Sequence, residues 1–82
     1  MSLLNSTEIT RIRDLGTLRR GDVIEAHLRS EVHFRGRVEE TAPGIGVVWI
    51  RDESDGRRAI LHADEYAIWQ IRRTLQEGNL AA

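Results

Sequence analysis

Apolar and polar residues alternate along the middle of the chain, and alternation with a period of two predicts half-buried β-strands. In residues 22–28 the apolar positions of this alternation are Ile24, Ala26 and Leu28. The same period continues through residues 32–40. We therefore expect two neighbouring antiparallel strands that bury one face and expose the other.

The turn between these strands is predicted to contain residues 29–31, because an odd turn length sets apolar residues opposite apolar residues. This register pairs Ala26 with Phe34 and His27 with His33. Two facing imidazoles could bind a metal or respond to pH, and two solvated histidines are the simpler alternative. No third ligand is expected nearby, so the sequence predicts no metal site.

Three more strands are expected, over residues 45–52, 57–62 and 68–72. Residues 47–50 are apolar on both faces, which is typical of a central strand or of a face covered by a helix or a partner. Asp55-Gly56 is a hairpin turn signal. Ile60 and Leu61 must point to opposite faces, and the pattern does not decide which one is buried.

The start of the chain carries signals typical of a short helix over residues 6–15. Asn5 and Glu8 have the spacing of a capping box. Gly16 stands where a helix commonly ends. The apolar residues that would share one face of this helix are Ile9, Ile12 and Leu15.

The length of 82 residues favours one domain. We expect an N-terminal tail over residues 1–5, a single domain with a leading helix over residues 6–72, and a C-terminal tail over residues 73–82. A domain of this size is only marginally stable alone, so self-association or a partner surface is a reasonable expectation.

The order of these elements resembles the small-barrel superfold shared by Src-homology-three-like, Tudor-like and Sm-like domains. The resemblance covers roughly residues 15–72 and rests on element order together with Gly21-Asp22, Pro43-Gly44, Asp55-Gly56 and the last strand from Ile68 to Ile71. It implies a mainly β fold, a five-stranded barrel preceded by a short helix. A fold by itself does not assign a function.

Composition narrows the function classes. The chain has no cysteine, which excludes disulfides, thiolate metal sites and a cysteine nucleophile, and fits a cytoplasmic location. No apolar run approaches the roughly 20 residues of a membrane span. Gly44-Ile45-Gly46 lacks the strand-then-helix context of a phosphate loop. We expect neither an enzyme nor a cofactor.

The aromatic residues suggest a protein-interaction or assembly module. If Val48 and Ile50 point into the core, Trp49 points out of it. On the last strand, Trp69 and Ile71 alternate with Ile68 and Gln70. Exposed tryptophans are typical interface anchors. We expect Trp49, Tyr66 and Trp69 to bind a protein partner or a second copy of the chain. The alternative is that the leading helix covers both tryptophans.

The arginines suggest a second function, nucleic-acid binding. All 12 basic residues are arginine, although the net charge is −1. The candidate contacts to phosphates are Arg29, Arg35 and Arg37 on one strand face, with Arg19 and Arg20 near its end. Against this hypothesis, Glu25 is expected to pair with Arg35, and stacking aromatics are not interleaved. A self-compensated charged face is the alternative.

Overall fold

A computed structural model of the chain describes the backbone of residues 4–76 and the side chains of residues 6–73. The strands are β1 (Leu4–Ile12), β2 (Val23–Leu28), β3 (Glu31–Ala42), β4 (Val47–Asp52), β5 (Arg58–His62) and β6 (Ala67–Gln76). Two short 3-10 turns, η1 (Leu15–Thr17) and η2 (Pro43–Ile45), join them. The mainly β class is thus confirmed. Over residues 4–76 there is no α-helix, and hence no helix with the length and apolar character needed to cross a membrane.

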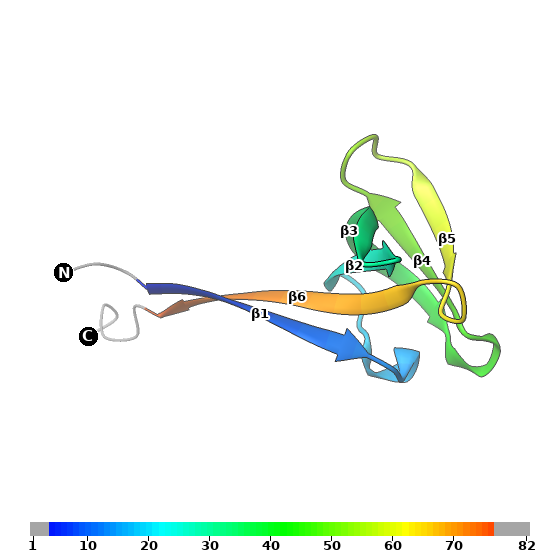
Figure 1. The fold of residues 1–82 in the computed structure, drawn as a ribbon, viewed down its shortest axis with the longest axis horizontal. Coiled ribbons are helices and arrows are strands. Elements are labelled where there is room, and N and C mark those ends of the chain that lie inside the picture. Colours follow the sequence, from blue (N-terminus) through cyan, green and yellow to red (C-terminus); the bar gives the residue numbers. More distant parts are fainter. Residues whose placement is uncertain (1–3, 77–82) are drawn as a thin grey trace.

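All six strands form one antiparallel sheet in the order β1-β6-β2-β3-β4-β5. β2 to β5 follow one another as a meander, and β6 returns to lie between β1 and β2 (Figure 1). Within the described residues no ladder joins β5 to β6 or β1. The expected five-stranded barrel is therefore not confirmed, because the sheet bends over its core without closing.

The predicted helix over residues 6–15 is wrong. The segment forms β1, in which Ile9 lies opposite Ile71 and Ile12 lies opposite Ile68 of β6. A helix cap contributes only about 1 kcal/mol. Pairing with β6 supplies a full ladder of backbone hydrogen bonds and buries Ile12. The β-branched residues that favour the extended form are Thr7, Ile9, Thr10 and Ile12.

The connection after β1 covers one end of the core. The Asp14 carboxylate accepts a hydrogen bond from the Gly16 N–H at 2.8 Å, which holds the 3-10 turn η1. This turn and the residue after it bury Leu15 and Leu18. Gly16, which was expected to end a helix, lies within this 3-10 turn instead.

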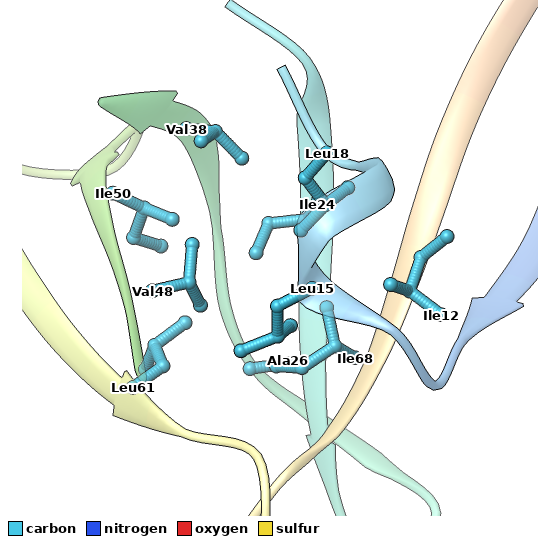
Figure 2. Packing of buried hydrophobic residues seen from close by; sticks show 10 residues of the cluster. All are labelled: Ile12, Leu15, Leu18, Ile24, Ala26, Val38, Val48, Ile50, Leu61 and Ile68. Atoms are coloured by element: carbon cyan, nitrogen blue, oxygen red, sulfur yellow. The ribbon is translucent and has the colours of Figure 1, made fainter. Parts of the chain in front are cut away.

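The core lies on the concave side of the bent sheet. Figure 2 shows side chains of β4 and β5 directed toward those of β2 and β6, with Leu15 and Leu18 beside Ile24. Leu61 is fully buried and Ile60 is 56% exposed, which decides the orientation that the sequence left open. The remaining members of the cluster are Ile12, Ala26, Val38, Val48, Ile50 and Ile68.

The β2–β3 turn differs from the prediction. Ala26 lies opposite Phe34 as expected, but the register then shifts, and His27 lies opposite Val32. The turn contains only Arg29 and Ser30, both with positive φ, at 54° and 69°. A bulge at His33 leaves this residue without a partner in β2. The bulge allows a two-residue turn and still sets Ala26 opposite Phe34. His27 and His33 therefore do not face each other.

Pro43 and Gly44 lie in the turn between β3 and β4. Residues 43–45 form η2, and the left-handed residue that ends this turn is Gly46, with φ of 68°.

β3 bends sharply at Gly36. Its first half pairs with β2 and its second half with β4, and Gly36 has partners on both sides, Ile24 and Asp52. A Cβ atom at Gly36 would overlap the carbonyl oxygen of Arg51 and lie 2.8 Å from its carbonyl carbon. Only glycine allows β3 and β4 to approach so closely. This bend turns β4 and β5 back over β2 and β6.

Beyond the body of the sheet, β1 and β6 continue as a two-stranded ribbon. Residues 72–76 of β6 pair with residues 4–8 of β1 and have no partner in β2 (Figure 1). The radius of gyration is 14.4 Å, against about 12 Å for a compact domain of this length. The sheet thus includes residues 4–5 and 73–76, which the sequence assigned to tails. Residues 1–3 and 77–82 of those tails lie outside the described part.

We predict that Gly36→Ala destabilises the fold by about 3 kcal/mol, because the added methyl group forces β3 and β4 apart. Gly44→Ala is the matched control, since a Cβ atom there meets nothing within 4 Å and φ is not positive. Urea unfolding of both variants measures the difference. An equal, small effect of the two substitutions would contradict the role of Gly36.

Candidate interaction surface

The side of the sheet opposite the core, called the outer face here, carries the candidate functional residues. Its central row crosses three strands, from Ile9 of β1 through Ile71 of β6 to Val23 of β2. Ile9 is 56% exposed, whereas Ile71 and Val23 are half-buried. An apolar row on the solvent side of a sheet whose other side already holds the core favours an interaction surface.

Trp69 occupies the neighbouring row of the outer face. It is half-buried, and Ile68 beside it in β6 is buried, so Trp69 points away from the core. The Arg11 guanidinium lies 5.8 Å from the centroid of the Trp69 ring, and the His27 ring lies 5.7 Å away. Because the predicted helix is absent, these two side chains, not a helix, flank the indole.

Glu25 fixes the polar groups beside Trp69. Its carboxylate lies 2.9 Å from His27 Nε2 and accepts a hydrogen bond from an Arg35 guanidinium nitrogen at 3.3 Å. Arg35 also lies 3.5 Å from Glu53. The predicted pairing of Glu25 with Arg35 is thus confirmed. Two carboxylates compensate the charge of Arg35, and His27 is held against the tryptophan.

Trp49 lies elsewhere on the outer face. It is half-buried between fully buried Val48 and Ile50, as expected, and opposite Ile60 on β5. The Arg58 guanidinium lies 5.8 Å from its ring centroid. Arg58 is held in turn by Glu39 at 3.0 Å. An ion-paired arginine therefore lies beside Trp49.

Tyr66 supports the core more than it serves the surface. It follows the turn after β5, where its N–H donates to the His62 carbonyl oxygen at 3.0 Å. Its ring packs edge-on against Phe34, with centroids 5.7 Å apart, and near His33 at 6.3 Å. Trp49, Tyr66 and Trp69 thus have separate neighbours and do not form one joint site.

The predicted arginine face is only partly assembled. Arg35 and Arg37 lie on the outer face of β3. Arg29 lies in the β2–β3 turn at the other end of β2, and Arg19 and Arg20 lie in the loop before β2. Arg29 therefore lies away from Arg35 and Arg37, whereas Arg19 and Arg20 precede Gly21, whose carbonyl oxygen accepts a hydrogen bond from Arg37.

The structure instead adds Arg73, which the sequence analysis had placed in a tail. Arg73 lines an open cleft of about 270 Å³ together with Arg35 and Arg37. The signal that could have found it is the alternation of β6 beyond its predicted end, because Trp69, Ile71 and Arg73 share one face. Val23, Ile71 and Glu53 complete the lining.

A second open cleft, of about 400 Å³, lies between the β2–β3 hairpin and the β4–β5 loop. It is lined by Val32, His33, Phe34, Arg35, Asp52, Glu53 and Ser54. Across residues 4–76, no group of three or more histidine or carboxylate side chains is arranged to hold a metal ion. Both clefts lie at the surface, in keeping with an interior filled by side chains.

Asp52 orders the loop beside this cleft. One of its carboxylate oxygens accepts hydrogen bonds from the Ser54 hydroxyl at 2.6 Å and from the Ser54 N–H at 2.7 Å. These bonds favour the charged form and lower the pKa of Asp52 below its ordinary value of 3.8.

Comparison of the chain with protein-family models, with curated proteins and with solved structures finds no match.

We predict that Asp52→Asn lowers the stability of the protein at neutral pH, because the amide accepts the two Ser54 hydrogen bonds more weakly than a carboxylate does. Since the native pKa of Asp52 lies below its unfolded value, this contribution is complete above pH 3.8 and is lost as the pH falls through the native pKa. Urea unfolding of both proteins at a series of pH values should show the two stabilities converging in acid. A constant difference across that range would contradict the assignment.

Proposed function

We propose that the chain is a non-enzymatic protein-interaction module that assembles with a second copy of itself. The contact is made by the free edge of β1 and the adjoining outer face, with Ile9 at its centre and Trp69 beside it. The observation on which this rests is the exposed, apolar Ile9 on a long edge strand.

The two edges of the sheet are unequal. β1 is nine residues long and β5 is five. A long edge strand presents unpaired backbone groups to another strand, whereas a short edge limits such pairing. In addition, part of β1 belongs to a two-stranded ribbon, and such ribbons are only marginally stable without a third strand. These features favour β1 as the edge that recruits a partner strand.

A second copy fits this edge by symmetry. A two-fold axis perpendicular to the sheet pairs β1 with β1 antiparallel and keeps both outer faces on one side. Residues that lie opposite each other must then both point to the outer face, so the sum of their residue numbers is even. Centring the pairing at residue 9 sets Ile9 opposite Ile9 of the other copy. Thr7 then lies opposite Arg11. No like charges meet, whereas centring at residue 8 would oppose two copies of Glu8.

This register also explains the composition of the outer face near β1. Ile71 is the neighbour of Ile9 in the same row, so the two copies would form a continuous apolar strip across the joint sheet. Trp69 and Arg11 lie in the adjacent row and would flank this strip. Trp49 and Tyr66 lie away from this edge and take no part in the proposed contact.

We predict that the wild-type chain sediments as a dimer and that Ile9→Lys makes it a monomer. The substitution removes about 2 kcal/mol of apolar burial from each copy and sets two lysines opposite each other, so the dimer Kd should rise more than about a hundredfold. Val32→Lys is the matched control, because Val32 is 53% exposed and lies on the β2–β3 hairpin. A wild-type chain that stays monomeric across the accessible concentration range would refute the proposal.

A single-cysteine variant tests the register. Because the chain contains no cysteine, Ile9→Cys should form an intermolecular disulfide under mild oxidation, since directly opposed strand residues bring their Cβ atoms close enough to bridge. Non-reducing gel electrophoresis measures the fraction of cross-linked dimer. Ile60→Cys, at the same 56% exposure on β5, is the control. Preferential cross-linking through residue 60 would assign the contact to the β5 edge instead.

A further inference from the structure

We infer that the cleft lined by Arg35, Arg37 and Arg73 is a binding site for a phosphate group, with Arg37 and Arg73 as its principal ligands. The site shares Ile71 with the apolar strip of the proposed dimer but does not depend on self-assembly. It does not use the free edge of β1, and none of the three arginines belongs to that strand.

The cleft exists because neighbouring strands differ in length. β2 begins at Val23, which pairs with Ile71 of β6 on one side and with Arg37 of β3 on the other. β6 continues past this point into the ribbon. Arg73 is two residues beyond Ile71 and therefore on the same face. Arginines from two strands thus line the cleft together with the apolar residues Val23 and Ile71.

The charges around the cleft are not all compensated. Arg35 has carboxylate partners in Glu25 and Glu53. Among residues 6–73, no carboxylate oxygen lies within 4.0 Å of a side-chain nitrogen of Arg37 or Arg73. By the same criterion, Arg58, which lies beside Trp49, has carboxylate partners in Glu39 and Glu40. The cleft therefore gathers two arginine charges that lack a counter-ion in the described structure.

Arg37 is oriented for binding. One of its guanidinium nitrogens donates a hydrogen bond to the Gly21 carbonyl oxygen at 3.2 Å. This is the one hydrogen bond described for its side chain, so the other donors of the planar group remain available. A guanidinium that is already positioned loses less conformational freedom when it binds an anion.

The arrangement suits phosphate better than carboxylate. A planar carboxylate is satisfied by one guanidinium fork. A phosphate has more oxygens and carries up to two charges, so arginines from two different strands can each bind separate oxygens. The apolar residues Val23 and Ile71 exclude water on one side and strengthen these charge interactions. Glu53 at the rim acts in the opposite direction and moderates the affinity.

The chain as a whole favours a small phosphate over a long polyanion. Its net charge is −1, which provides no overall attraction for a nucleic acid. Acidic residues also line the neighbouring cleft. There the carboxylates of Asp52 and Glu53 would repel the phosphates of a nucleic acid that extended beyond the arginine cleft. We therefore expect inorganic phosphate or a phosphomonoester as the ligand.

The test is an NMR titration of the full chain with inorganic phosphate and, separately, with a single-stranded oligonucleotide, both in chloride-free buffer. Phosphate should cause saturable shifts of the amide signals of Val23, Arg37 and Arg73. Arg37→Gln and Arg73→Gln should each weaken binding about tenfold, as expected for one hydrogen bond between charged groups. Arg29→Gln, which removes the same charge at the other end of β2, should leave the affinity unchanged.

Glu53→Gln adds a test that structural damage cannot imitate. It removes the carboxylate at the rim, so phosphate should bind about threefold more tightly, as expected for the loss of one nearby like-sign charge. Shifts that do not saturate, or an equal loss of affinity in Arg29→Gln, would overturn the site. Binding of the oligonucleotide without binding of phosphate would contradict the assignment of a small phosphate as the ligand.

Discussion

The bend of β3 at Gly36 is the constraint on which the rest of the structure depends. A single sheet can bury one of its faces only if it turns back over itself, and here β3 changes partner from β2 to β4 at this point. The missing Cβ atom allows the Arg51 carbonyl group to approach. A second irregularity, between Val38 and Glu40, adds twist just beyond the bend. Together they bring Val48, Ile50 and Leu61 over Ile24 and Ile68 (Figure 2).

The same bend organises the outer face. Curvature that packs apolar side chains together on the concave side separates the side chains on the convex side. Long arginine side chains suit that side, because their stems cover apolar surface while their charged ends reach water. Three of them, Arg35, Arg51 and Arg58, have carboxylate partners, and the last two share Glu39. Arg37 and Arg73 differ because they lie where β2 begins and the sheet leaves a cleft.

The two strands over residues 22–40 could be predicted from alternation, because one face of each is buried and the side-chain period is two. The later strands were indicated by apolar residues and the Asp55-Gly56 turn signal, and Trp49 was expected outside the core because Val48 and Ile50 point into it. The helix over residues 6–15 could not be excluded, because its capping signals are local, whereas pairing with β6 joins residues far apart in the sequence. The predicted pairing of His27 with His33 was wrong. A bulge in β3 keeps apolar residues opposite apolar residues just as a three-residue turn would. Arg73 was missed because a strand that continues into a ribbon has no buried residue to mark its end.

The position of β6 between β1 and β2 has a consequence for how the chain reaches this fold. β2 to β5 pair with their neighbours in sequence and need only short loops to close. Among the described strands β1 has a single partner, β6, which is the last of the six to be synthesised. Until residues 67–76 have been synthesised, β1 cannot form this pairing, and the pairing closes a loop that contains all the other strands. Such distant pairing slows folding and leaves β1 exposed to other chains in the meantime.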